Sequence, residues 1–166
     1  MQLFLLRHAE AEHQAASDEA RVLTAKGAKQ AESVGQFCLA HGLIPEIILS
    51  SPLKRTEETA RLVAHELNSP KSVQTAEFLR CGMTAERALS GVREYLIGFT
   101  NREKVPAETS IMLVGHEPDF STLAGVLIGG HSRSVHFRKA ALLAISLREL
   151  KPGAGTIEFF VPVKLL

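Results

Sequence analysis

Two arginines and two histidines in this chain could bind and transfer a phosphoryl group if folding brought them together. Arg7 and His8 directly follow the apolar run Leu3-Phe4-Leu5-Leu6, and Arg55 and His116 each follow another apolar run. Guanidinium groups match phosphate oxygens in two-point contacts. Neutral imidazole is a nucleophile, and its ordinary pKa of about 6.5 leaves it largely unprotonated at neutral pH. Together these groups could hold a phosphoryl group and attack it in line.

The elements that must position these residues alternate between strand and helix along the chain. Short apolar runs predict strands, and apolar residues at helical spacing predict helices. The expected strands are 2–6, 46–50, 72–76, 110–114, 141–148 and 156–161. The expected helices are 25–40, 52–67, 85–99 and one that contains 120–127 and ends at Gly129-Gly130, with a loop at 77–82 and a polar linker at 101–109.

Local end signals support two of these helices. Thr24 is expected to cap the helix at 25–40, and His41-Gly42 to end it. Ser51 is expected to cap the next helix, with Pro52 at its first position, where a missing N–H costs nothing. Arg55 then falls in the first helical turn.

This alternation predicts an α/β fold in one domain, residues 1–166. We expect a three-layer α/β/α sandwich whose central sheet is mainly parallel, with at least one antiparallel strand in the closing hairpin. Ligands of such sheets sit beyond the carboxyl ends of the strands. Arg7, His8, Arg55 and His116 should therefore gather at one edge.

Composition excludes several classes of function. The net charge is +1, and the scattered basic residues lack interleaved aromatic side chains, so we expect neither nucleic acid nor a membrane as partner. The start lacks a signal peptide and no apolar run approaches about 20 residues, so a cytoplasmic location is expected. Cys38 and Cys81 fit neither a zinc site nor a disulfide framework, and both are expected to be reduced.

A metal site is the main chemical alternative at the same edge. His8 and His116, with Glu10, Glu117 and Asp119 nearby in sequence, could ligate a cation. However, no helical His-x-x-x-His pair is present, and two arginines would repel the metal. The glycines match neither a P-loop nor a dinucleotide fingerprint. We therefore expect no metal and no cofactor.

Three ordered motifs resemble the histidine phosphatase superfamily, which has the phosphoglycerate-mutase-like fold. The first is Leu5-Leu6-Arg7-His8-Ala9-Glu10, with Ala9 where the family has Gly. The second is Ser50-Ser51-Pro52-Leu53-Lys54-Arg55-Thr56-Glu57-Glu58-Thr59-Ala60. The third is the apolar strand followed by Gly115-His116. The resemblance implies that His8 is the nucleophile and forms a phosphohistidine intermediate, and that Arg7, Arg55 and His116 complete the phosphate pocket.

The small size and the stretch 18–27 resemble the SixA branch of that superfamily, the bacterial protein phosphohistidine phosphatases. Val22 stands where the branch has Pro, and the Cys81-Gly82 loop is similar. The resemblance implies Arg21 as an accessory phosphate ligand, and Ser51 of the second motif is expected beside it. Larger relatives use a carboxylate as general acid, and Glu77 is the nearest candidate here. The branch is thought to manage without a strong acid.

The expected substrate follows from the absence of a long insertion between 50 and 77 that could form a lid. An uncovered pocket suits a phosphorylated side chain on a protein, such as a histidine phosphotransfer-type domain. The leading hypothesis is therefore a protein phosphohistidine phosphatase. The alternatives are a phosphatase or mutase for small phosphate esters, and a non-enzymatic phosphate-binding module. The sequence does not indicate an oligomeric state.

Overall fold

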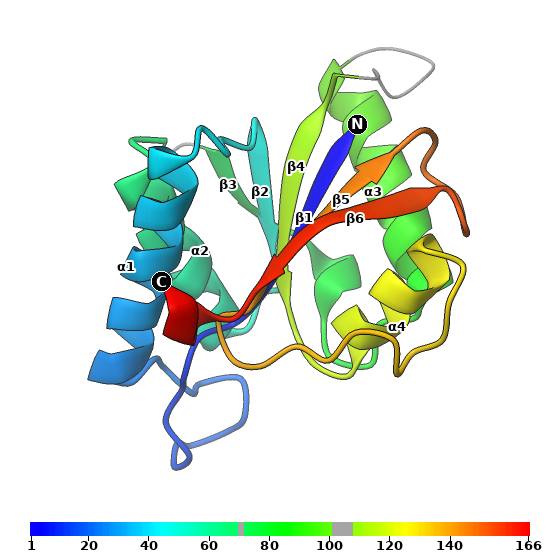
Figure 1. The fold of residues 1–166 in the computed structure, drawn as a ribbon. Coiled ribbons are helices and arrows are strands. Elements are labelled where there is room, and N and C mark those ends of the chain that lie inside the picture. Colours follow the sequence, from blue (N-terminus) through cyan, green and yellow to red (C-terminus); the bar gives the residue numbers. More distant parts are fainter. Residues whose placement is uncertain (70–71, 101–107) are drawn as a thin grey trace.

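The computed structural model describes residues 1–69, 72–100 and 108–166, and the backbone of this part is organised around a central sheet (Figure 1). The strand order is β3-β2-β4-β1-β5-β6. The strands are β1 Gln2–Arg7, β2 Ile47–Ser50, β3 Val73–Thr75, β4 Ser110–Gly115, β5 Leu142–Leu147 and β6 Gly155–Val161.

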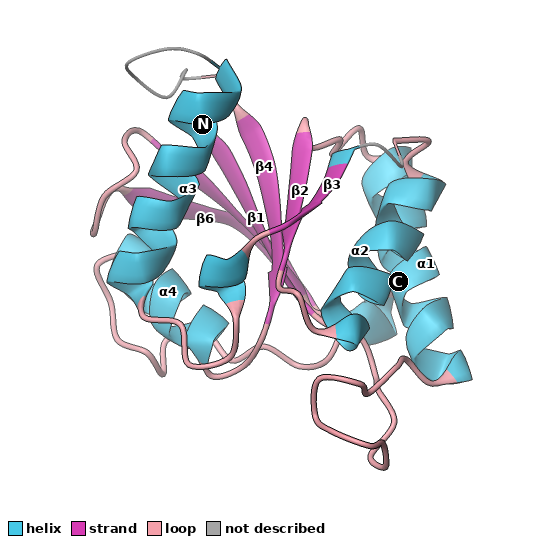
Figure 2. Ribbon diagram, turned by 180° about the vertical axis from the view of Figure 1, so that it is seen from behind, coloured by secondary structure: helices cyan, strands magenta, loops and turns pink. Residues whose placement is uncertain are grey.

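Helices cover both faces of the sheet. They are α1 Ala25–Ala40, α2 Lys54–Glu66, α3 Ala85–Thr100 and α4 Asp119–Leu127, with short 3-10 helices η2 Glu77–Leu79 and η3 Val163–Leu165. Helices α1 and α2 pack together on one face, and α3 and α4 on the other (Figure 2). The predicted α/β/α layering is confirmed, and the expected loop at 77–82 contains the short helix η2.

Burial on both faces explains why β1 reads as a continuous apolar run. Leu3 and Leu5 belong to the core beneath α3 and α4, whereas Phe4 and Leu6 belong to the core beneath α1 and α2. Alternate side chains of a strand point to opposite faces, so a strand covered on both sides needs apolar residues at every position.

The strand register places the predicted site residues at one edge. Strand β1 runs parallel to β4 with Arg7 opposite Gly115, and β2 runs parallel to β4 with Ser50 opposite Val114. The carboxyl ends of these three central strands therefore lie side by side, at the lower end of the sheet in Figure 1. This confirms the predicted convergence of the strand ends.

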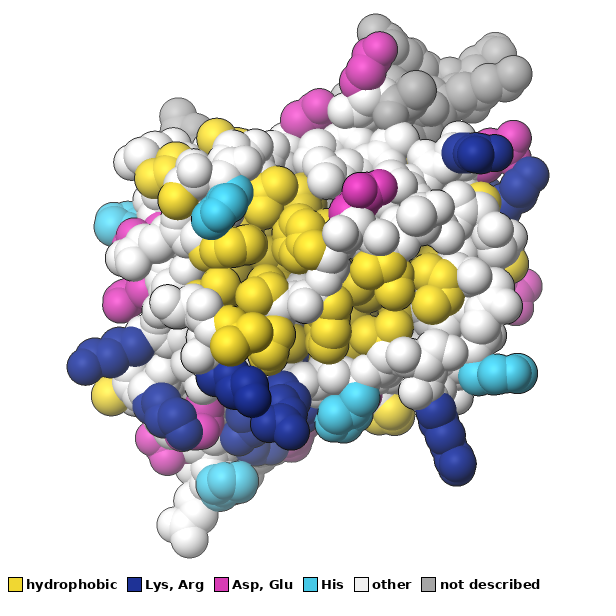
Figure 3. Space-filling view, viewed as in Figure 1, with side chains coloured by type: hydrophobic (Ala, Val, Ile, Leu, Met, Phe, Trp, Pro, Cys, Tyr) yellow, Lys and Arg dark blue, Asp and Glu magenta, His cyan; other side chains and the backbone are white. Residues whose placement is uncertain are grey.

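The closing hairpin adds two antiparallel pairings. Strand β5 runs antiparallel to β1, and β6 runs antiparallel to β5 and forms the sheet edge. Because Ala144 pairs with Phe159 and Ile145 with Ile157, Glu158 is an extra, bulged residue in β6. A bulge and a charge both discourage edge-to-edge pairing. On the face of the molecule that is turned toward the viewer in Figure 1, hydrophobic side chains nevertheless form a broad band (Figure 3).

One predicted helix start is confirmed and one is wrong. Thr24 Oγ1 accepts the backbone N–H of Gly27 at 2.9 Å and so caps α1. Ser51 does not cap α2, which begins at Lys54 with Leu53 at the N-cap position and no side-chain cap. Ser51 instead continues the sheet, because its N–H donates to Val114 O at 3.0 Å. Arg55 still lies in the first turn of α2, as predicted.

The remaining predictions concern the cysteines, the linker and membrane spans. Cys38 is buried in α1, and both cysteines are free thiols. Most of the expected linker, 101–107, lies outside the described residues. Within the described part of the chain, no helix has the length and apolarity needed to cross a bilayer.

Candidate active site

His8 lies immediately after β1, and one of its ring nitrogens has a free lone pair. Its Nδ1 lies 2.7 Å from the backbone oxygen of Ala9. Since a carbonyl oxygen can only accept, Nδ1 carries the proton, and the neutral ring has its lone pair on Nε2. Burial, followed by the charges of nearby groups that include Arg55 and Arg7, lowers the pKa of His8 to about 3. The ring is therefore neutral and nucleophilic at neutral pH.

His116, immediately after β4, faces His8. The two ring centroids are 5.5 Å apart, and the ring planes are inclined by 57°. His116 Nε2 lies 2.8 Å from Ser51 Oγ, while Nδ1 is buried without a hydrogen-bond partner among the described residues. Burial, and then the charge of Arg55, lowers the pKa of His116 to about 4.

Arg55 brings a buried guanidinium to the same place. The residue is only 4% exposed. Its Nη1 donates to the backbone oxygen of Asp18 at 2.7 Å, and its Nη2 donates to Asp18 Oδ2 at 3.0 Å. Within the described chain, its Nε is buried without a partner.

Arg7 supplies a second guanidinium. Its Nη1 donates to the backbone oxygen of Phe137 at 2.7 Å, and its buried Nε has no partner in the described ranges. Burial lowers the pKa of Arg7, and the charge of Glu117 opposes that effect.

These four side chains form one electrostatic unit. The charges of Arg7 and Arg55 each lower the pKa of both His8 and His116, so both cations lie close to both rings. Buried cations are costly unless an anion compensates them. A buried guanidinium, Arg55, and a partly buried one, Arg7, each have a buried, unused Nε donor in the described chain. Beside a neutral imidazole, they are suited to bind a phosphoryl group and accept it on nitrogen.

The two accessory residues predicted from sequence lie next to this unit. Ser51 is fully buried and contacts His116 through the hydrogen bond described above. Arg21 is partly exposed, and its Nη1 donates to Asp18 Oδ1 at 2.9 Å. Arg21 is therefore connected to Arg55 through the same carboxylate.

Glu77, the general-acid candidate from the sequence, lies in the short helix η2 and pairs with a neighbouring arginine. Its side chain is 69% exposed, and its Oε2 accepts from Arg80 Nε at 2.7 Å. Arg80 also pairs with Glu19 at 2.9 Å. Glu77 thus belongs to a surface ion-pair network.

Glu117 and Asp119, which the sequence suggested only as metal ligands, lie one and three positions after His116. Ser121 donates to Glu117 Oε1, and His136 Nδ1 lies 3.3 Å from the same oxygen. Asp119 Oδ2 accepts the backbone N–H groups of Gly82 and Met83 at 2.8 and 3.2 Å. Burial raises the pKa of Asp119. In the sequence, the signal that Glu117 and Asp119 lie near the site is their position within three residues of His116.

The described residues do not assemble a metal-binding group. In residues 1–69, 72–100 and 108–166, no three His, Cys, Asp or Glu side chains are placed to share an ion. Glu10 instead pairs with Lys26 at 3.0 Å, and Asp119 is occupied by the two backbone N–H groups.

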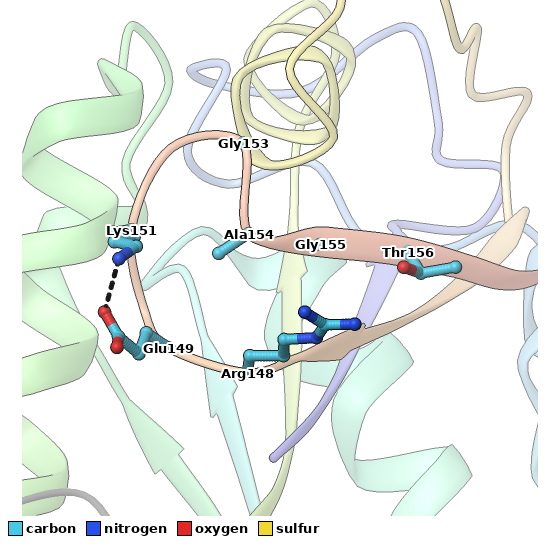
Figure 4. A pocket seen from close by; sticks show the side chains of 7 residues that line it. All are labelled: Arg148, Glu149, Lys151, Gly153, Ala154, Gly155 and Thr156. Atoms are coloured by element: carbon cyan, nitrogen blue, oxygen red, sulfur yellow. Dashed lines mark ion pairs between the residues drawn. The ribbon is translucent and has the colours of Figure 1, made fainter.

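Four surface hollows in the described part of the chain are lined by residues other than Arg7, His8, Arg55 and His116. The one in Figure 4, of about 430 Å³, is formed by the β5–β6 turn, where Glu149 and Lys151 pair at 2.6 Å. Because β5 is antiparallel to β1, this turn lies beside the amino end of β1, at the opposite end of the strands from His8. The other three hollows, of about 490, 470 and 210 Å³, also have none of Arg7, His8, Arg55 and His116 in their linings.

The fold and the paired arginines and histidines define a phosphoryl-handling class of α/β protein. Comparison with known families gives the same class, because the model of the histidine phosphatase superfamily (branch 1) matches residues 3–90. The chain belongs to the histidine phosphatase superfamily, and it is a hydrolase of that superfamily.

Several of the proteins that this chain resembles carry the name SixA. The chain is 29% identical over 160 residues to phosphohistidine phosphatase SixA of Escherichia coli, which covers 96% of this chain and 92% of that protein. It is 33% identical over 136 residues to a SixA homolog of Haemophilus influenzae, covering 78% of each. A solved structure of the protein histidine phosphatase SixA complexed with tungstate superposes with a TM-score of 0.83 at 26% identity, covering 99% of both chains.

Proposed function

We propose that this protein removes the phosphoryl group from phosphohistidine on a protein, through a phosphorylated His8 intermediate. The observation that carries the proposal is the fixed tautomer of His8, whose Nδ1 is bonded to Ala9 O so that Nε2 is free to attack. Arg7, Arg55 and His116 around it would bind the phosphoryl oxygens and stabilise the charge that shifts in the transition state.

The reaction would proceed in two displacements. In the first, His8 Nε2 forms a bond to phosphorus while the P–N bond of the substrate breaks. The electron pair stays on the substrate imidazole, which leaves as a neutral ring because its other nitrogen carries a proton. In the second, water attacks phosphorus and the bond to His8 Nε2 breaks, with its electron pair returning to that nitrogen. Both protons of the water leave on the phosphate, which is released as dihydrogen phosphate. Both steps use the same pair of guanidinium groups, which need not move between them.

Two findings favour a phosphohistidine over a phosphate ester as substrate. An alkoxide leaving group needs a strong general acid, whereas an imidazole leaving group does not. Glu77, the acid candidate from sequence, is exposed and paired with Arg80. In addition, two relatives are named phosphohistidine phosphatase SixA or its homolog, and a similar solved structure is that of the protein histidine phosphatase SixA complexed with tungstate.

The proposal is tested by supplying the enzyme with both substrate classes side by side. A phosphorylated histidine phosphotransfer domain and a panel of sugar phosphates would be offered to the wild-type enzyme. We expect faster release of phosphate from the phosphohistidine protein, and a trapped phosphoenzyme with the acid-labile, alkali-stable bond of phosphohistidine. Preferential hydrolysis of a sugar phosphate would instead establish the small-ester phosphatase, and the absence of any turnover would support the binding module.

A further inference from the structure

Asp18 connects two of the arginines at the candidate site. Its Oδ2 accepts from Arg55 Nη2 at 3.0 Å, and its Oδ1 accepts from Arg21 Nη1 at 2.9 Å. Its backbone oxygen also accepts from Arg55 Nη1 at 2.7 Å. One residue therefore holds both terminal nitrogens of Arg55 and one of Arg21.

The environments of the two charges differ. Arg55 is 4% exposed, whereas the side chain of Asp18 is 59% exposed, on a loop whose residues 12–19 are all exposed. A buried guanidinium needs hydrogen-bond acceptors, and Asp18 provides two of them from outside the core. Cys81 Sγ, 3.6 Å from Arg55 Nη2, is a further but weaker contact.

The contacts leave Arg55 with a defined orientation. With Nη1 and Nη2 both bonded to Asp18, the plane of the guanidinium is fixed, and Nε is the buried donor that remains unused in the described chain. A donor that is already oriented binds the developing charge of a transferring phosphoryl group without reorganising during the reaction.

We propose that Asp18 is a positioning residue, which fixes the Arg55 guanidinium and tethers Arg21 so that both face the substrate phosphoryl group. The inference rests on the proposed function, and it makes the loop around Asp18 part of the substrate-binding apparatus. The carboxylate neutralises one of the two guanidinium charges, so the Arg21–Asp18–Arg55 cluster keeps one net positive charge for the phosphoryl dianion. Asp18 itself does not contact the reacting atoms.

The experiment compares inorganic phosphate binding, by calorimetry, in Asp18→Ala, Asp18→Asn and Glu19→Gln. Glu19 is the matched control, because it is an exposed carboxylate on the same loop whose side chain pairs with Arg80. We expect Asp18→Ala to weaken phosphate binding about tenfold to a hundredfold, because a misoriented guanidinium loses a charge-assisted hydrogen bond to the phosphate. Asp18→Asn keeps an oxygen for Arg55 Nη2 and should recover part of the loss, while Glu19→Gln should bind as the wild type does.

A second readout follows Arg55 directly and does not depend on binding. In the wild type, the Nε–H of a fixed guanidinium should give a distinct, slowly exchanging NMR signal, assigned by its loss in Arg55→Lys. That signal should broaden or exchange faster in Asp18→Ala and persist in Glu19→Gln. A purely structural role of the loop would lower the thermal unfolding midpoint of the variant but leave the signal unchanged.

The outcomes separate this inference from the proposed function. Phosphate binding to Asp18→Ala that equals or exceeds wild-type binding would overturn the positioning role, and tighter binding would identify Asp18 as an anion that competes with the substrate. An Arg55 signal unchanged in Asp18→Ala would overturn it too. A wild-type enzyme that binds phosphate but does not hydrolyse phosphohistidine would refute the proposed function alone.

Discussion

The rings of His8 and His116 lie 5.5 Å apart, yet their hydrogen bonds differ in kind. His8 donates to a backbone carbonyl, which fixes its tautomer, whereas His116 bonds a hydroxyl that can either donate or accept. This difference favours His8 as the nucleophile and leaves His116 free to adjust its protonation to the phosphoryl oxygens. Both rings share the property of being buried and neutral.

The neutral rings predict an unusual pH dependence. With folded-state pKa values of about 3 for His8 and about 4 for His116, neither ring should titrate near pH 6.5. In NMR titrations, the ring signals lost in His8→Asn and His116→Asn should stay constant from pH 8 to about pH 5. A midpoint near 6.5 for either signal would contradict the buried, neutral assignment.

The same pKa values predict how stability changes with pH. The unfolded chain binds protons on both histidines below pH 6.5, whereas the folded protein does not, so stability falls as pH drops from 6.5 toward 4. Each ring contributes a slope of about 1.4 kcal/mol per pH unit in that window. Urea unfolding at several pH values measures the slope, which should be shallower in His8→Asn.

Replacing His8 by Asn should abolish turnover while leaving the fold intact. Removal of a nucleophile costs about 10⁴-fold or more in kcat. The matched control is His41→Asn, because His41 makes the same bond from Nδ1 to a backbone oxygen, at 2.8 Å to Phe37, but is exposed at the end of α1. Hydrolysis of phosphohistidine by His8→Asn at a near wild-type rate would exclude His8 as the nucleophile.

Ser51→Ala tests the hydrogen bond to His116. Loss of the 2.8 Å contact should lower kcat/KM about tenfold and stability by about 1 kcal/mol, the net value of one hydrogen bond. Ser50→Ala is the control, since Ser50 is equally buried but its Oγ donates to the backbone oxygen of Ser51. Equal losses of activity in both variants would show that general packing, and not the imidazole contact, is responsible.

The convergence of Arg7, His8, Arg55 and His116 could be predicted because each lies at the end of a strand with a strong apolar pattern or in the segment that follows such a strand. Buried parallel strands need apolar residues at every position, and that requirement is visible in the sequence. Parallel direction then fixes which ends meet. Ala9 stands where the family has Gly. It is not among the described residues with positive φ, so its backbone does not require glycine.

Other parts of the site could not be predicted, because long-range contacts decide them. Ser51 has the sequence of a helix cap, but its backbone pairs with β4 and its hydroxyl with His116. Asp18 lies in a polar stretch without periodicity, so nothing local indicates that it contacts Arg55, 37 positions away.

Activity should survive removal of divalent metal ions. In the described ranges, Glu10 is paired with Lys26 and Asp119 with two backbone N–H groups, and the charge at the site is supplied by arginines. We therefore expect equal rates of phosphohistidine hydrolysis before and after dialysis against EDTA. A loss that added Mg²⁺, Mn²⁺ or Zn²⁺ restores would revive the metal-site interpretation.

Gly115, the residue before His116, provides a test of how tightly the third motif is packed. A Cβ at this position would lie 2.6 Å from the ring of Phe120, which is buried in the core and cannot withdraw. Gly115→Ala should therefore destabilise the protein by about 1–3 kcal/mol, the usual cost of overpacking. Displacement of the adjacent His116 should lower kcat as well.

Gly98→Ala is the control for that substitution. Gly98 lies in α3 and is exposed. Among the described residues beyond its chain neighbours and the backbone of its own helix turn, no atom lies within 4 Å of the position of an added Cβ. Alanine there should stabilise the protein by about 0.5–1 kcal/mol, because glycine loses more backbone entropy in a helix. Thermal and urea unfolding of both variants measures the two opposite shifts. If Gly115→Ala were as stable as the wild type, the close approach of Phe120 to β4 would be wrong, and with it the packing that orients His116.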